Sequence, residues 1–95
     1  MSVYAIAQGK VTNQDAFNDY LALAGPTLEA HNVGLLSIDE DPAVVEGEID
    51  FPRTVILEFN DHEHFYQWYN SPEYQAAREH RLTASVGRFL LVNGL

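Results

Sequence analysis

Runs of β-branched, aromatic and other apolar residues predict short strands along the chain. These runs cover residues 3–8, 34–38, 43–47, 54–59 and 88–92. An acidic stretch containing a proline separates the second run from the third and favours a turn, so we expect these two strands to pair as a hairpin. The run at 54–59 is the clearest strand of the chain.

Apolar residues at spacings of three and four predict a helix after residue 13, with either Thr12 or Asn13 as its N-cap. Its apolar stripe is formed by Ala16, Phe17, Tyr20, Leu21, Ala24 and Leu28. His31 falls on the same stripe near the end of the helix. Pro26 cannot donate to the carbonyl four residues before it, so we expect a kink or a break at this position.

A second helical region is expected in two pieces. Asp61 can cap a short helix, and Ser71 can cap a following one with Pro72 at its first position. Gly87 is expected to end that helix. The short helix carries an aromatic face formed by Phe65, Trp68 and Tyr69.

The predicted order β-α-β-β-α-β, with the middle β-region elaborated as a hairpin, is the ferredoxin-like arrangement of the α+β class, built on an antiparallel sheet. A chain of 95 residues is expected to form a single domain over 1–95. Two helices cover only one face of such a sheet, yet the strands are apolar at nearly every position. We therefore predict a homodimer in which two sheets pack face to face, a dimeric α/β-barrel.

Charge restricts the partners of this domain. Five Lys and Arg against fourteen Asp and Glu give a formal net charge of −9, which disfavours nucleic acid and anionic membrane surfaces as partners. Without cysteine there is no disulfide framework and no thiolate nucleophile. The N-terminus resembles no targeting signal, so we expect a full-length cytoplasmic protein. The acidic stretch 39–50 lacks the EF-hand spacing and is interpreted as a solvated hairpin.

Two arginines fall on a helix face that should be buried. At about 100° per residue, one narrow arc holds Tyr74, Ala77, Arg78, Arg81 and Ser85. A buried guanidinium requires a carboxylate, carbonyl groups or a bound anion. With Arg88 these residues form either a structural group, whose stems cover the core, or a pocket for a small anion or a polarised carbonyl.

Glu58 lies in mid-strand on the same face as Ile56, where it is a candidate general base or the structural partner of Arg78 or Arg88. Near the helix break at Ser71, aromatic residues either line a cavity beside Arg81 or serve packing alone. These are Trp68, Tyr69 and Tyr74.

Other chemistry finds little support in the sequence. The imidazoles of His62 and His64 would point about 200° apart on a helix, and no third ligand is near, so no metal is expected. Ser85-Val86-Gly87 lacks the first glycine of a nucleophile elbow. The glycines form no nucleotide-binding motif, so we expect no cofactor.

Several segments resemble the DUF1330 family of small bacterial proteins. They are residues 4–7, 11–13, 17–20, 44–47, 55–59 and 68–75. The most specific is Tyr69-Asn70-Ser71-Pro72-Glu73-Tyr74, followed by Arg81 and Gly87. The resemblance implies a dimeric α/β-barrel, and the family carries no established activity. The wider fold group includes cofactor-independent monooxygenases, muconolactone isomerase-like enzymes, chlorite dismutase-like haem proteins and sensor domains. No histidine here is placed as an axial haem ligand.

These observations lead to one expected function with two alternatives. We expect a small-molecule enzyme, monooxygenase- or isomerase-like, that acts without metal or nucleotide on a planar enolisable or aromatic substrate. The substrate would lie against Trp68 and Tyr69 while Arg81 and Arg88 hold oxyanion charge and Glu58 moves a proton. The remaining binding residues would be Ser71, Tyr74 and Arg78. The alternatives are a binding or sensing dimer without catalysis and a dimer whose arginines are wholly structural.

Overall fold

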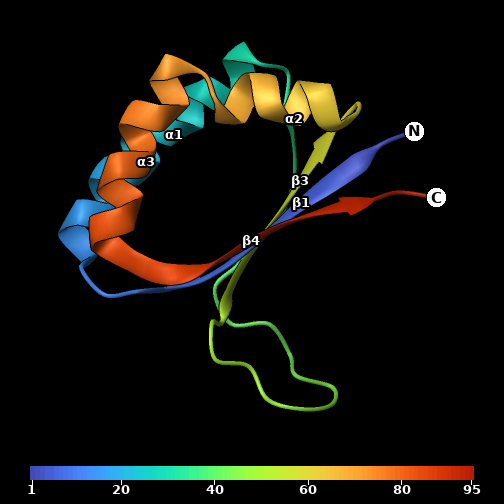
Figure 1. The fold of residues 1–95 in the computed structure, drawn as a ribbon. Helices are drawn as coiled ribbons and strands as arrows, with labels where there is room; N and C mark the ends of the chain where they lie inside the picture. The colour runs from blue at the N-terminus through green and yellow to red at the C-terminus, as the bar shows by residue number, and fades with distance from the viewer.

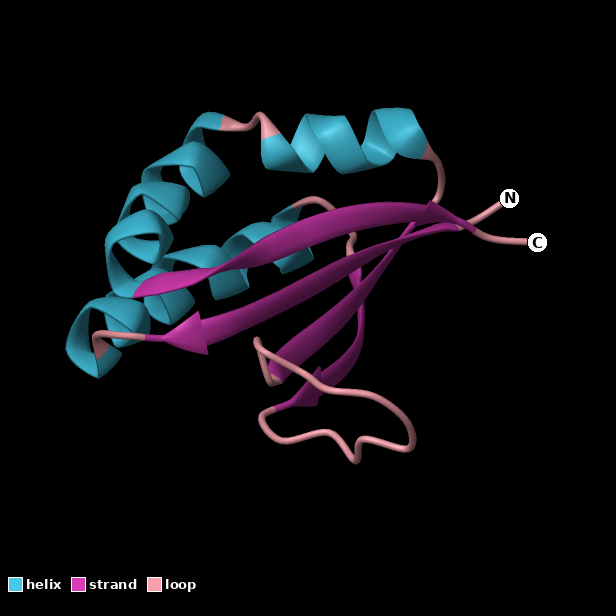
Figure 2. Cartoon of the chain, turned by 60° about the horizontal axis from the view of Figure 1, so that its bottom comes forward, coloured by secondary structure: helices cyan, strands magenta, loops and turns pink.

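A four-stranded antiparallel sheet with three helices on one face forms the fold of this chain (Figure 1). The computed structural model describes all residues, 1–95. The elements are β1 (Val3–Val11), α1 (Gln14–Ala30), β2 (Gly34–Asp39), β3 (Arg53–Phe59), α2 (His62–Tyr69), α3 (Pro72–Ala84) and β4 (Ser85–Asn93). The strand order is β2-β3-β1-β4. This is the predicted α+β, ferredoxin-like βαββαβ fold, and Figure 2 shows its helices gathered on one side of the sheet.

The helices begin where side-chain caps satisfy their first backbone donors. Asn13, not Thr12, caps α1, with its side-chain oxygen 3.1 Å from the Ala16 amide nitrogen. Asp61 caps α2 in the same way at 2.8 Å. Ser71 caps α3, with Pro72 in its first turn. The predicted caps at Asp61 and Ser71 are therefore confirmed.

Of the kink or break predicted at Pro26, the break is wrong, because α1 runs through this residue without interruption. Pro26 is exposed, whereas Ala24 and Thr27 on either side are buried. The proline removes one backbone hydrogen bond. Packing of the buried neighbours against the rest of the molecule outweighs that loss and keeps the helix continuous.

The predicted strand at 43–47 is also wrong, and β2 pairs directly with β3. Residues 40–52 form a long connection, here called the acidic arm, which extends away from the helix layer (Figure 1). Val45 is 92% exposed, and Gly47 adopts a positive φ of 88° that does not continue a strand. β2 is an edge strand with β3 on one side, and the arm leaves the other edge of β2 unpaired.

Gly87 does not end α3, contrary to the prediction, because the helix stops at Ala84 and Gly87 lies within β4. It is paired with Gly9 of β1. A Cβ at Gly87 would collide with the carbonyl oxygen of Gln8. The glycine therefore permits the close approach of two strands rather than a helix end.

The two faces of the sheet have different surroundings. Val3, Ala5, Leu57 and Phe59 are buried beneath the helices. Apolar side chains of the other face, here called the outer face, remain open in the single chain, and Leu90 for example is 48% exposed. This is the face that the sequence predicts to be covered by a second copy.

Trp68 lies at the centre of the core and joins two helices. Its ring centroid is 4.1 Å from that of Tyr74 and 5.5 Å from that of Phe59. Its indole nitrogen donates to the hydroxyl of Thr27 in α1 at 2.9 Å, and that hydroxyl donates to the Ala24 carbonyl at 2.6 Å. The buried indole donor is thus satisfied by a residue 41 positions away.

Replacing Thr27 by valine tests this contact. Thr27→Val keeps the side-chain volume but leaves the Trp68 donor buried without a partner, and we expect the free energy of unfolding to fall by about 1–3 kcal/mol. Urea denaturation measures the change. Thr83→Val is the matched control, because the exposed Thr83 hydroxyl also donates to a carbonyl three residues before it. Equal losses in both variants would mean that the Trp68 contact contributes nothing.

Candidate functional site

A partly open cavity of about 500 Å³ lies between the helices and the sheet, lined by residues of all three helices and all four strands. Its apolar walls include Phe17, Leu57, Trp68 and Phe89. The cavity exists because small residues occupy the sheet beneath it. Arg53, Gly9 and Gly87 form one row across β3, β1 and β4, and two of these three positions carry no side chain.

The lining of the cavity is cationic in an otherwise acidic protein. Four of the five Lys and Arg residues contribute to it, and none of the fourteen Asp and Glu residues does. The four are Lys10, Arg53, Arg81 and Arg88. Strand alternation turns the exposed side chains of Lys10 and Arg88 to the outer face, so Arg53 and Arg81 are the two cations on the helix-covered side. In a chain with a net charge of −9 these two guanidiniums favour an anionic occupant.

Arg81 has no partner for its charge. It lies in the last turn of α3, and its Nε is buried without a hydrogen-bond partner. The guanidinium carbon is 5.8 Å from the ring centroid of Phe89 in β4, and no carboxylate lies within 4.0 Å. Arg81 also lines the cavity, and a buried N–H donor without an acceptor in such a residue is suited to an incoming anion or carbonyl oxygen.

Tyr20 of α1 supplies a second donor to the cavity. Its hydroxyl is 3.0 Å from that of Tyr74, which is fully buried, does not line the cavity and has no other partner. Either hydroxyl can donate in this pair, and when Tyr74 donates, the Tyr20 proton is free to point into the cavity. Burial, reinforced by Tyr74, raises the pKa of Tyr20 far above its ordinary value, so it stays a neutral donor.

Arg53 also lines the cavity, but its charge is already paired. Its Nε donates to Glu40 at the start of the acidic arm at 3.0 Å, and its guanidinium carbon is 4.9 Å from the ring centroid of Phe17. Sequence reasoning missed both Arg53 and Tyr20 as site residues. The signal for Tyr20 was present, because it places a hydroxyl on an otherwise apolar stripe.

Glu58 forms no ion pair with Arg78, one of its two expected structural partners. In β3 its neighbours Leu57 and Phe59 point into the helix-covered core, so the alternation of the strand turns Glu58 to the outer face. There it lies opposite Gly34 of β2, whose missing side chain leaves room for it. No ion pair joins it to Arg88 either.

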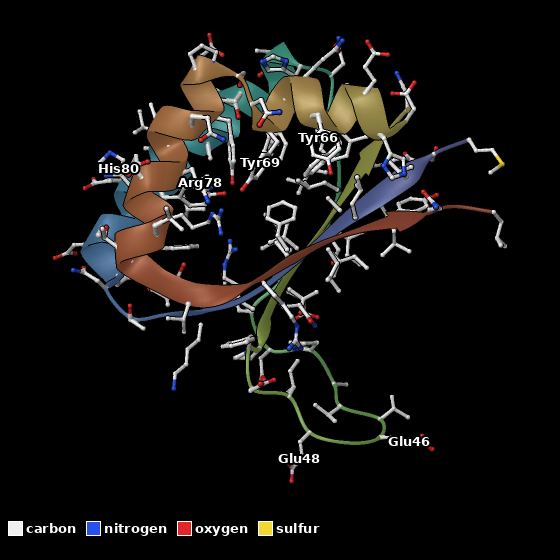
Figure 3. All side chains as sticks on the ribbon, viewed as in Figure 1. Glu46, Glu48, Tyr66, Tyr69, Arg78 and His80 are labelled. Atoms are coloured by element: carbon white, nitrogen blue, oxygen red, sulfur yellow. The ribbon has the colours of Figure 1, made fainter.

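The other two predicted arginines bind elsewhere. Arg88 is exposed, and its Nε donates to Gln8 at 2.9 Å while its Nη2 lies 3.8 Å from Asp50. Arg78 donates to the hydroxyl of Tyr69 at 2.9 Å, a contact that Figure 3 shows beneath α3. Arg78 does not line the cavity.

Ser71 does not line the cavity that Arg81 borders. The Ser71 hydroxyl donates to the Trp68 carbonyl at 2.7 Å and caps α3, so it is fully engaged. Trp68 lines the cavity between the helices and the sheet, but Tyr69 and Tyr74 do not. Tyr74 is connected to the cavity through the hydrogen bond between its hydroxyl and that of Tyr20.

The two neighbouring histidines make separate structural contacts. Nε2 of His64 lies 2.6 Å from the His31 carbonyl oxygen, and its Nδ1 accepts from the Asn60 amide. His62 bonds to Asn93. No group of three or more His, Cys, Asp or Glu residues is arranged to hold a metal ion. No helix is long and apolar enough to span a membrane.

Comparison with known families assigns the chain. Residues 2–95 match the model described as "Domain of unknown function (DUF1330)", and the protein belongs to this family. Comparison with curated protein sequences gives no match.

Solved structures with the same fold come from several bacteria. A protein of unknown function from Rhodopseudomonas palustris superposes with a TM-score of 0.83 and 17% identity, over 99% of this chain and 82% of that one. SnoaB, a cofactor-independent oxygenase from Streptomyces nogalater, gives 0.71 and 15%, over 99% and 93%. A dimeric protein of unknown function with a ferredoxin-like fold from Bacteroides fragilis gives 0.67 and 13%, over 98% and 96%. At these identities the similarity shows the fold alone.

Removal of the unpartnered charge should stabilise the fold. We expect Arg81→Met to raise the free energy of unfolding by about 1 kcal/mol, because an apolar side chain of similar length ends the desolvation of an uncompensated cation. Chemical denaturation without ligand is the measurement. Arg53→Met is the control, since its charge is balanced by Glu40 and its loss should not stabilise. Destabilisation by Arg81→Met would instead assign Arg81 to the structural framework.

Proposed function

We propose that this protein binds a planar organic anion, an ionised phenol, an enolate or an aromatic carboxylate, in the cavity between α1, α3 and the sheet. The observation that carries this proposal is the buried Nε of Arg81, which has no partner in the chain. An anion that accepts a hydrogen bond from this donor replaces the hydrogen bond to water that burial removes. The rings of Phe17, Trp68 and Phe89 favour a flat apolar body beside it.

Two donors would hold the anionic oxygen of this ligand. The guanidinium of Arg81 supplies charge and directional N–H groups, and the neutral hydroxyl of Tyr20 supplies a second hydrogen bond. In this proposal Tyr74 donates to Tyr20, which frees the Tyr20 proton for the ligand and polarises its hydroxyl. Both groups are positioned by helices packed on a sheet and need little rearrangement when the ligand arrives.

Catalysis on the bound anion is the second candidate function. The fold similarity to SnoaB, a cofactor-independent oxygenase, favours it. In such a reaction the stabilised phenolate or enolate would be the electron donor and dioxygen the acceptor. No carboxylate or imidazole lines the cavity, so the most suitable substrates are acids that are already ionised near neutral pH. Glu58, on the outer face, is not the base of this proposal.

A second copy of the chain would cover the outer face. Val86, Leu90 and Val92 are each 42–52% exposed in the single chain and lie on one side of β4 with the side chains of Ile6 and Ile56. An apolar surface of this kind is rarely left open in a soluble protein. The structural relative from Bacteroides fragilis is described as dimeric, which supports a homodimer here.

Calorimetric titration with 2-naphthoate tests the binding proposal. We expect saturable binding by the native protein and at least about a hundredfold weaker binding by Arg81→Gln, because a charged hydrogen bond to the carboxylate is lost. Arg78→Gln is the matched control, because it removes the same charge one turn earlier on α3 without touching the cavity. If both variants weaken binding of 2-naphthoate equally, the cause is the change in net charge, and a site at Arg81 is contradicted.

Sedimentation velocity tests the dimer. Ile56→Asp places a charge on the outer face and is expected to yield a monomer, because burial of an unpaired carboxylate in the interface is strongly unfavourable. Leu23→Asp is the control, since this residue is 46% exposed on the helix layer and should not affect assembly. A native protein that sediments as a monomer at micromolar concentration would refute the proposed interface.

A further inference from the structure

The two arginines that face into the cavity differ in how their charge is compensated. Arg81 has no carboxylate partner. Arg53 has one in Glu40, and the pair is asymmetric, because the side chain of Arg53 is 14% exposed and that of Glu40 is 70% exposed. The carboxylate therefore comes from the solvent side and neutralises an arginine of the cavity wall. One uncompensated guanidinium remains inside.

We infer that Glu40 sets the charge of the ligand, so that the cavity accepts a planar monoanion and rejects the dianion of the same shape. This inference rests on the proposed binding function. It makes Glu40 a specificity-determining residue, although Glu40 itself does not line the cavity. The ligand class becomes a flat molecule with one acidic group at Arg81 and an uncharged end towards Arg53 and Phe17.

Electrostatics at Arg53 supports this selection. Arg53, Arg81 and Tyr20 all line the same cavity, and both arginines oppose the rise of the Tyr20 pKa. A second carboxylate on the ligand would reach the Arg53 side and meet Glu40 there. The ligand carboxylate would either displace Glu40 from its 3.0 Å hydrogen bond with Arg53 or remain beside Glu40. Two carboxylates side by side repel each other, which is strongly unfavourable.

The acidic arm provides a matched control for Glu40. Glu46 and Glu48 lie in the same arm, carry the same charge and make no ion pair. Figure 3 shows both at the far end of the arm, away from the helices. A variant at Glu46 therefore changes the net charge of the arm by the same amount as a variant at Glu40 but leaves Arg53 neutralised.

Calorimetric titration with two probes of one shape tests the inference. The probes are 2-naphthoate, a monoanion, and naphthalene-2,6-dicarboxylate, a dianion. We expect the native protein to bind the monoanion at least about tenfold more tightly, and Glu40→Gln to remove this preference by exposing the charge of Arg53. Glu46→Gln should keep the native ratio. Glu40→Asp, which retains the charge, should restore much of the preference.

Other outcomes separate the two proposals. If the native protein binds both probes equally, or if Glu40→Gln and Glu46→Gln change the ratio alike, selection by Glu40 is refuted while the binding function stands. If neither the native protein nor Glu40→Gln binds either probe at millimolar concentration, the binding function fails, and the selection that rests on it fails too.

Discussion

The alternation of β3 is the constraint on which the rest of this structure depends. Leu57 and Phe59 enter the core beneath the helices, and Arg53 points to the same side of the sheet, whereas Glu58 faces outwards. Seven residue pairs with β1, from Val3–Phe59 to Gly9–Arg53, hold this register. A shift by one residue would exchange the faces, moving Glu58 under the helices and Arg53 out of the cavity. The cationic character of the cavity is therefore a consequence of strand pairing.

The cavity also depends on what the neighbouring strands lack. Gly9 and Gly87 sit side by side next to Arg53, and Gly87 is required because the backbone of Gln8 approaches so closely. The helices close the space from above, where the contact between Trp68 and Thr27 fixes α2 against α1. An empty volume in the core and an unpartnered buried donor on Arg81 each lower the stability of the fold. We interpret both as features retained for binding.

Local signals predicted much of the fold. The caps at Asp61 and Ser71 and the strand around 54–59 each depend on residues close together in the chain, and they were predicted correctly. The errors involve competition over longer distances. The segment 43–47 has strand composition but stays in the exposed arm, while β2 pairs with the distant β3. Pro26 is held in a helix by its buried neighbours, and Gly87 permits the close approach of two strands. In each case tertiary packing overrode a valid local preference.

The sequence by itself determined the order of the elements, the acidic surface and the placement of Arg78 and Arg81 on a helix face turned towards the sheet, because these follow from periodicity and composition. Only the tertiary structure decided which charged groups meet. It placed Glu58 behind the sheet, paired Arg53 with Glu40 and left Arg81 alone beside Tyr20. Such choices arise from strand register and helix docking, which bring together residues far apart in the chain and cannot be derived from spacing along it.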